Sequence, residues 1–208
     1  MEPMAIAQRL QAEFPGEVLE RYTYQGQTAV VIQPGRVRDI LRWLRDTPEI
    51  RMNHLRSLCG VDNSRHRVDP NLMRFEVVYH LYSIEHRHGL RVRVEVGEED
   101  PVIDSVVSLW PGANWLERET WDLLGIRFTG HPDLRRVLLP DDWEGHPLRK
   151  EYPLRGKGEW SGLVELQAMA RELDKHSFDP DNPPPAPAPS LTRKKGQPTK
   201  FLNEEEGA

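Results

Sequence analysis

Two stretches in the first hundred residues alternate strictly between apolar and polar positions. The apolar members are Phe75, Val77, Tyr79 and Leu81 in the first stretch and Leu90, Val92, Val94 and Val96 in the second. Successive side chains of a β-strand point to opposite faces of its sheet, so this period predicts two strands that each bury one face. Gly89 precedes the second stretch and helps the chain to turn between them.

The residues before these strands predict two helices and three further strands. Apolar side chains recur at helical spacing from Ile6 to Phe14 and again over residues 36–45. Two β-rich runs, residues 18–24 and 28–32, flank Gln25-Gly26 as in a hairpin, and a third strand is expected within residues 52–61. The order α-β-β-α-β-β-β predicts an α+β, two-layer domain with a mixed sheet and helices on one side.

A further helix is predicted over residues 114–124, and it completes an α+β domain that spans residues 1–125. Asn114 and Glu117 have the spacing of a capping box, and Gly125 follows as a helix stop. Arg118 and Asp122 lie four residues apart on one side of this helix, which usually indicates a surface ion pair. A role for this acidic helix in proton transfer or metal binding is the less favoured alternative.

The chain after this helix is predicted to be irregular over residues 126–158. Pro132, Pro140, Pro147 and Pro153 recur there every six to eight residues, a spacing that forbids long helices and central strands. Apolar residues are scattered between the prolines, and they need a surface to bury against, in this domain or on another chain. A short helix is predicted for residues 159–176 and a proline-rich, extended tail for residues 177–208.

Composition and charge exclude several classes of protein. The 208 residues, 38% of them hydrophobic, suffice for one domain with an extension. A net charge of −5 and a pI near 5.9 argue against general binding to nucleic acid. No apolar run approaches the roughly 20 residues that span a bilayer, and the N-terminus lacks a signal-peptide pattern. Cys59, the single cysteine, excludes an internal disulfide and is interpreted as a buried thiol in a reducing, cytoplasmic setting.

Histidines and carboxylates in residues 130–152 are the candidates for chemistry. His131 and His146 each stand between a glycine and a proline, with Asp133, Asp141, Asp142 and Glu144 nearby. Their separation lacks the short ligand pairs of zinc sites, so we expect each imidazole to donate to a backbone carbonyl. A stand-alone metal-dependent enzyme remains the alternative from another class. Three more histidines, His80, His86 and His88, are expected to be exposed. No nucleophile motif or phosphate loop is found.

The run ERETWDLLGIRFTGHPDLRRVLLPDDWEGHPLRKEYPL, residues 117–154, closely resembles the signature region of the 30 kDa subunit of respiratory complex I, which is the C subunit of bacterial NADH–quinone oxidoreductase. Glu151 departs conservatively from the aspartate of many members. The residues that carry the resemblance, and that are predicted to contact partners, are Glu117, Arg118, Glu119, Asp122, Gly125, His131, Pro132, Arg135, Leu139, Pro140, Trp143, Gly145, His146, Pro147, Arg149, Lys150, Tyr152 and Pro153.

The resemblance implies a subunit of a proton-pumping NADH–quinone oxidoreductase that has no catalytic activity, metal or cofactor of its own. FMN, iron–sulfur clusters and quinone are implied in its partners, the 49 kDa-type subunit and the neighbouring cluster-bearing subunits of the hydrophilic arm. The implied location is the cytoplasmic face of the bacterial inner membrane, with membrane contact only through the complex. Related membrane-bound hydrogenases and ferredoxin-linked quinone reductases have equivalent subunits, and the motif does not identify the electron donor.

These two lines of reasoning make residues 130–152 a predicted docking surface. Proline and glycine pre-set the backbone, which lowers the entropic cost of ordering it on binding. Basic side chains would pair with carboxylates in the chain or across the interface: Arg118, Arg135, Arg136, Arg149 and Lys150. Apolar anchors would come from Leu138, Leu139, Trp143 and Leu148, since buried Trp and Arg often dominate interface energies.

Overall fold

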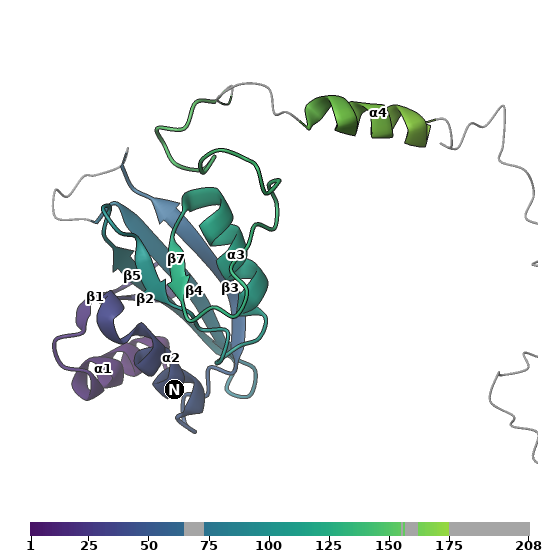
Figure 1. Ribbon diagram of the computed structural model, residues 1–208. Helices are drawn as coiled ribbons and strands as arrows, with labels where there is room; N and C mark the ends of the chain where they lie inside the picture. The colour runs from purple at the N-terminus through teal and green to yellow at the C-terminus, as the bar shows by residue number, and fades with distance from the viewer. Residues whose placement is uncertain (65–72, 155, 157–161, 175–208) are drawn as a thin grey trace, which may run out of the picture. The chain divides into compact units, whose positions relative to one another are not determined.

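The computed structural model describes residues 1–64, 73–154, 156 and 162–174 (Figure 1). The chain divides into two compact units, Met1–Gly158 and Glu159–Ala208. The second unit is described over residues 162–174, which include helix α4 (Leu163–Asp174). Four of its large apolar side chains are exposed: Val164, Leu166, Met169 and Leu173. The tail predicted for residues 177–208 lies outside the described residues. None of the helices in the described ranges has the length and apolar character needed to cross a membrane.

A five-stranded mixed sheet forms the centre of the first unit (Figure 1). Its strands are β1 (Val18–Tyr24), β2 (Gln27–Ile32), β3 (His54–Asp62), β4 (Phe75–Ser83) and β5 (His88–Val96). They lie in the order β1-β2-β5-β4-β3. Strands β2 and β5 run parallel, and the other neighbours are antiparallel. The predicted α+β class with a mixed sheet is confirmed.

Three helices and a short 3₁₀ turn supply the second layer. These elements are α1 (Pro3–Glu13), η1 (Pro34–Arg36), α2 (Val37–Asp46) and α3 (Ala113–Leu124). All three helices bury apolar side chains in one continuous core, together with the apolar residues that alternate along β4 and β5. Phe75, Val77 and Tyr79 are fully buried there. The period of two therefore predicted the core face of both strands correctly.

Helix α3 lies between two short strands that the sequence did not predict, β6 (Val102–Asp104) and β7 (Arg127–Thr129), which pair in parallel. Three residues are too few to show a period of two. The helix also packs closely on β3. A Cβ built at Gly60 would lie 2.4 Å from Leu124 Cδ1 and 2.8 Å from Thr120 Cγ2. Glycine at this position therefore lets α3 pack directly on the sheet, together with the segment that follows the helix.

The second face of the sheet carries a mixture of apolar and charged side chains. Arg93 of β5 pairs there with the buried Glu76 of β4 at 2.7 Å. Cys59 pairs with Val78 across β3 and β4 and is exposed. The prediction of a buried thiol was wrong because Cys59 lies between Leu58 and Gly60, which point to the core, and so takes the opposite face.

Candidate functional site

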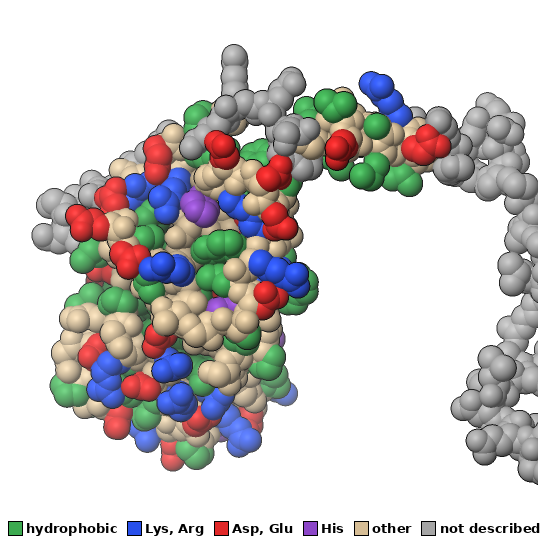
Figure 2. Space-filling model, viewed as in Figure 1, with side chains coloured by type: hydrophobic (Ala, Val, Ile, Leu, Met, Phe, Trp, Pro, Cys, Tyr) green, Lys and Arg blue, Asp and Glu red, His purple; other side chains and the backbone are tan. Residues whose placement is uncertain are grey.

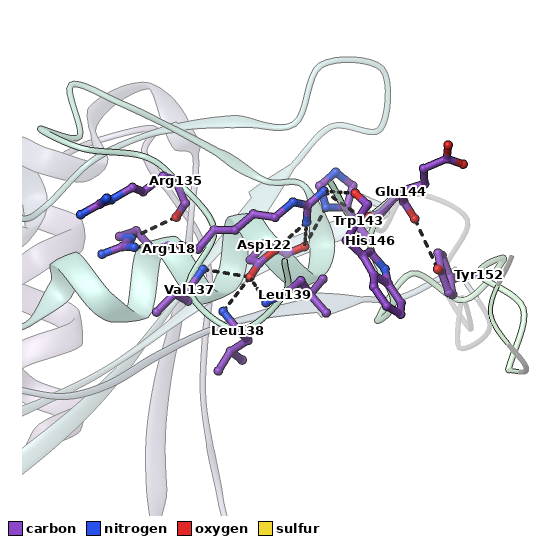
Figure 3. Close-up of polar contacts among 12 residues, drawn as sticks. Arg118, Asp122, Arg135, Val137, Leu138, Leu139, Trp143, Glu144, His146 and Tyr152 are labelled. Atoms are coloured by element: carbon purple, nitrogen blue, oxygen red, sulfur yellow. Dashed lines mark hydrogen bonds and ion pairs between the residues drawn. The ribbon is translucent and has the colours of Figure 1, made fainter. Parts of the chain in front are cut away.

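Asp122 is the centre of the polar network that joins α3 to the 130–152 segment (Figure 3). Its carboxylate is fully buried, and Oδ2 accepts hydrogen bonds from three consecutive amides, those of Val137 at 3.1 Å, Leu138 at 2.9 Å and Leu139 at 3.0 Å. Its Oδ1 accepts from Arg136 Nη1 at 2.6 Å. Burial alone would raise the pKa of Asp122, but these donors outweigh it and lower the pKa. The carboxylate is therefore charged and structural.

Two arginines bind main-chain carbonyls of the same segment. Arg136 Nη2 donates to the carbonyl of Trp143 at 2.7 Å, so this guanidinium links Asp122 to a second turn of the segment. Arg118 Nε donates to the carbonyl of Arg135 at 3.0 Å, and its Nη2 donates to that of Arg136 at 2.8 Å. Arg118 and Asp122 are both buried and bind different partners. The predicted surface ion pair between them was therefore wrong.

Both histidines of the Gly-His-Pro turns bind backbone carbonyls, as predicted. His131 Nδ1 accepts from the amide of Asp133 at 3.0 Å, so Nε2 carries the proton and donates to the carbonyl of Asn114 at 3.3 Å. His146 Nδ1 donates to the carbonyl of Asp122 at 2.8 Å. Burial, and then the nearby guanidinium groups, lower the pKa of His146. Among the described residues, no three His, Cys, Asp or Glu side chains are arranged to hold a metal ion.

The end of α3 is fastened to the second Gly-His-Pro turn. Gly125 ends the helix with a φ of +77°, and Arg149 Nε donates to the carbonyl of Leu124 at 2.7 Å. The amide of Leu148 donates to the carbonyl of Leu123 at 3.0 Å. The side chains of Arg149 and His146 pack against Gly125, since a Cβ there would lie 2.6 Å from atoms of both. The turn therefore packs directly on the helix stop.

A second buried carboxylate, Asp62 at the end of β3, holds the far end of the segment. Asp62 Oδ2 accepts from the amide of Lys150 at 3.0 Å and from Arg74 Nη2 at 3.2 Å. Arg74 in turn contacts Glu151. Burial would raise the pKa of Asp62, but the amides of Lys150 and Ser64 and the guanidinium of Arg74 outweigh it and lower the pKa to about 2. Sheet and helix therefore fix the segment at two separate places.

Glu117 is fully buried on α3 and faces away from this network. Its Oε1 accepts from the amide of Val106 at 2.7 Å, and it also bonds the side chain of Ser105. Burial raises the pKa of Glu117 to about 7, against a usual value of 4.5. The predicted capping box was wrong because α3 starts earlier, with Gly112 at its N-cap, and Asn114 lies within the helix. Glu117 bonds the loop before the helix.

We expect Glu117→Gln to stabilise the fold at alkaline pH. The native state keeps this proton up to a pH of about 7, whereas the unfolded chain loses it near 4.5, so the wild-type free energy of unfolding falls between these values and stays lower above them. Glutamine keeps an oxygen for Val106 and carries no charge. Urea unfolding at several pH values should show a gain of up to about 3 kcal/mol at pH 8 and almost none at pH 4. An equal effect at both pH values would contradict the assignment.

The structure brings most of the signature residues to one place. Those in the polar network or packed on it are Arg118, Asp122, Gly125, Arg135, Leu139, Trp143, Gly145, His146, Arg149 and Lys150. His131 bonds Asn114 and Asp133 instead. Tyr152 donates to the carbonyl of Glu144 at 3.3 Å, and Glu119 is exposed on α3. Pro132 and Pro153 are exposed, whereas Pro140 and Pro147 are half-buried. Sequence reasoning missed Asp62 and Arg74, which no motif or short spacing connects to this region.

Large apolar side chains remain exposed on the same segment, although its backbone is fixed. Leu138 and Leu148 are 61% and 53% exposed, and Leu154 is fully exposed. Trp115 on α3 is also exposed, with the guanidinium of Arg118 4.9 Å from its ring. Figure 2 shows hydrophobic side chains open on the face that carries α3, interspersed with basic and acidic ones. Of the predicted anchors, Leu139 and Trp143 are half-buried within the chain itself.

Known proteins resemble this chain over most of its length. Residues 30–158 match the family model of the respiratory-chain NADH dehydrogenase 30 Kd subunit. The C subunit of the NADH-quinone oxidoreductase of Roseiflexus castenholzii is 50% identical over 73% of this chain and 84% of its own length. Its counterpart in Roseiflexus sp. (strain RS-1) is 47% identical over 74% of this chain and 86% of its own length.

Two solved structures share the fold. A trypsin-resistant fragment of Nqo5, residues 1–134, is 34% identical, with a TM-score of 0.56, and aligns over 64% of this chain and 100% of the fragment. A chain of an archaeal membrane-bound sulfane sulfur reductase, 20% identical, has a TM-score of 0.59, which shows the fold alone. The sequence and structure matches agree with the signature found in residues 117–154. The chain therefore belongs to the family of the 30 kDa subunit of respiratory-chain NADH dehydrogenase.

Proposed function

We propose that this chain is a non-catalytic subunit in the peripheral arm of a proton-pumping NADH–quinone oxidoreductase. It would dock against the 49 kDa-type subunit and the neighbouring cluster-bearing subunits, which would hold the FMN, the iron–sulfur clusters and the quinone site. The complex would hold it at the cytoplasmic face of the inner membrane. The two Roseiflexus relatives, both named as a subunit of NADH-quinone oxidoreductase, support the assignment to this enzyme. Electron transfer would then run through the neighbours, and this chain would supply their support.

The observation that carries the docking role is a fixed backbone with exposed apolar side chains. Asp122 and Asp62 hold the 130–152 segment at two separate places, so binding would order little additional chain. Leu138 and Leu148 nevertheless face solvent. Burying a leucine side chain is worth about 1.5–3 kcal/mol, and the isolated chain gains only part of this energy at either position. A partner surface that covers both leucines would gain it.

The double substitution Leu138→Ser and Leu148→Ser tests this role. Because both side chains are already exposed, we expect the free energy of unfolding of the isolated chain to change by less than about 1 kcal/mol. Association should weaken by about 2–4 kcal/mol, because two apolar contacts are lost at the interface. The measurements are the amount of this subunit in the native membrane complex and the NADH:quinone turnover per assembled complex.

Leu19→Ser is the matched control, since Leu19 is a similarly exposed leucine on β1. The control should assemble normally, and the double variant should be depleted from the complex. Normal assembly of the double variant with full turnover would show that these leucines are not docking residues. Normal assembly with lost turnover would instead point to a direct chemical role for the segment.

A further inference from the structure

A basic cavity lies where β4 turns into β5 and β2 begins. Its volume is about 800 Å³, within the range of pockets that hold small molecules. Three arginines and three histidines contribute to its lining: Arg56, His80, His86, Arg87, His88 and Arg91. Within the described part of the chain, Glu2 is the one carboxylate that lines it. This site is separate from α3 and the 130–152 segment, and the docking role does not use it.

Among the described residues, the arginines of this cavity lack the acidic partners that most of the described arginines have. Among the described residues, Arg56, Arg87 and Arg91 form no ion pair with a carboxylate. Arg91 donates to the side-chain oxygen of Gln27, and its buried Nε has no hydrogen-bond partner in the part of the chain that the structure describes. The guanidinium of Arg56 stacks 4.6 Å from the ring centre of Tyr82. A chain of net charge −5 thus gathers three arginines and one carboxylate in one concave place.

The backbone brings these cations together through two irregular features. His80 and Arg91 are direct cross-strand partners in β4 and β5. The register of β3 against β4 shifts between Leu55 and Ser57, which makes Arg56 the extra residue of a β-bulge. Arg87, in the turn before β5, has a φ of +53°. Residues other than glycine seldom adopt this left-handed backbone conformation. Bulges and such strained residues concentrate beside functional sites, where they re-aim side chains.

Two further histidines line the cavity from the other face of the β4–β5 hairpin, because His88 and Arg91 point to opposite faces of β5. His86 and His88 stack with ring centres 5.7 Å apart, and their Nε2 atoms donate to the carbonyls of Pro48 and Ile50 at 2.8 and 2.9 Å. His88 is buried, and its Nδ1 has no partner among the described residues. Burial, followed by the charges of Arg91 and Arg56, lowers the pKa of His80. The expectation that these histidines are all exposed was wrong for His80 and His88.

We propose that this cavity binds the phosphate groups of an organic phosphate. Guanidinium forks match the oxygen geometry of phosphate, and they form charge-assisted hydrogen bonds that are stronger than neutral ones. These three guanidinium groups, which pair with no carboxylate among the described residues, can balance two or more negative charges, and Glu2 supplies only one. The volume exceeds that of an isolated ion and suits a diphosphate or a nucleotide. A concave, positively charged wall also concentrates such anions from solution.

The test is calorimetric titration of the full-length chain with pyrophosphate at physiological ionic strength. We expect binding of one pyrophosphate per chain. Arg91→Gln and Arg87→Gln should each weaken it by at least about tenfold, because each removes a charged hydrogen-bond donor. Arg87 is exposed in a turn, so its variant tests the site without disturbing the sheet. The matched control is Arg21→Gln, which removes an exposed arginine of β1 outside the cavity and should change the affinity by less than about twofold.

Two further titrations distinguish a lipid phosphate from a soluble one, and a phosphate from an acidic peptide. If vesicles containing phosphatidic acid bind through Arg87 and Arg91 while pyrophosphate does not, the phosphate belongs to a lipid headgroup and the proposal stands. Absence of binding in both arms overturns it. Equal weakening by the Arg21 control also overturns it, because binding would then reflect diffuse charge. A glutamate-rich peptide that binds more tightly than pyrophosphate, through the same arginines, would overturn it in favour of an acidic protein partner.

Discussion

Asp122→Ala is expected to lower the free energy of unfolding by about 3–5 kcal/mol, the loss typical of leaving one member of a buried ion pair without its partner. The substitution leaves the guanidinium of Arg136, which is 13% exposed, without its carboxylate partner. It also removes the acceptor of the amides of residues 137–139. Buried donors that lose their acceptor are costly because water cannot replace it. We therefore expect the segment to detach from α3, and the fold around it to weaken.

Urea unfolding and limited trypsin digestion of the isolated chain together measure this effect. Detachment should expose the bonds after Arg135 and Arg136, so cleavage there should accelerate in Asp122→Ala. Asp133→Ala is the control, because it removes an exposed carboxylate that pairs with Arg135 at 2.9 Å. Exposed pairs contribute about 0–1 kcal/mol, so the control should unfold almost like the wild type. Equal stability of the two variants would show that the Asp122 network does not hold the segment.

Gly125→Ala is expected to cost about 2–5 kcal/mol, for two separate reasons. Its φ of +77° is unfavourable for a residue with a Cβ by about 1–2 kcal/mol. The new Cβ would also lie 2.6 Å from Arg149 Nη2 and from the ring of His146. Overpacking of this kind costs about 1–3 kcal/mol. Both side chains would have to move, and the bond from Arg149 to the carbonyl of Leu124 would be lost.

Gly112→Ala provides the matched control at the other end of the same helix. Gly112 has a φ of −63°, and nothing lies within 4 Å of a Cβ built there. Thermal unfolding should place this control within about 0.5 kcal/mol of the wild type, or slightly above it. A loss of similar size in both variants would mean that glycine matters at Gly125 for some reason other than its φ and the packing of the second Gly-His-Pro turn.

The strands and helices with a clear period could be predicted from the sequence, and the short ones could not. Residues 75–81 and 90–96 alternate because one face of β4 and β5 meets the helices and the other meets solvent or charged neighbours. Strands β6 and β7 hold three residues each, too few for any period. The start of α3 was misplaced because Glu117 has the spacing of a capping residue but bonds Val106, in the loop before the helix.

The sequence identified many residues of the candidate site, but it did not predict which of them contact each other. The Gly-His-Pro turns allowed the backbone bonds of His131 and His146 to be expected, because the proline and glycine restrict what an imidazole there can reach. The spacing of Arg118 and Asp122 suggested a mutual pair, yet each finds its partner about 15 residues further on. Asp62 binds the amide of Lys150, 88 residues away. Short spacings in the sequence do not encode such long-range contacts.

The two buried carboxylates bind peptide groups of the segment: Asp122 the amides of residues 137–139, and Asp62 that of Lys150. A peptide N–H is the same whatever side chain accompanies it, proline excepted. Mutations at the outward positions can therefore alter the exposed surface of the segment while its backbone keeps its conformation. If the segment docks as proposed, its contact surface could change together with its partners during evolution, because the bonds that hold the backbone do not depend on the outward side chains.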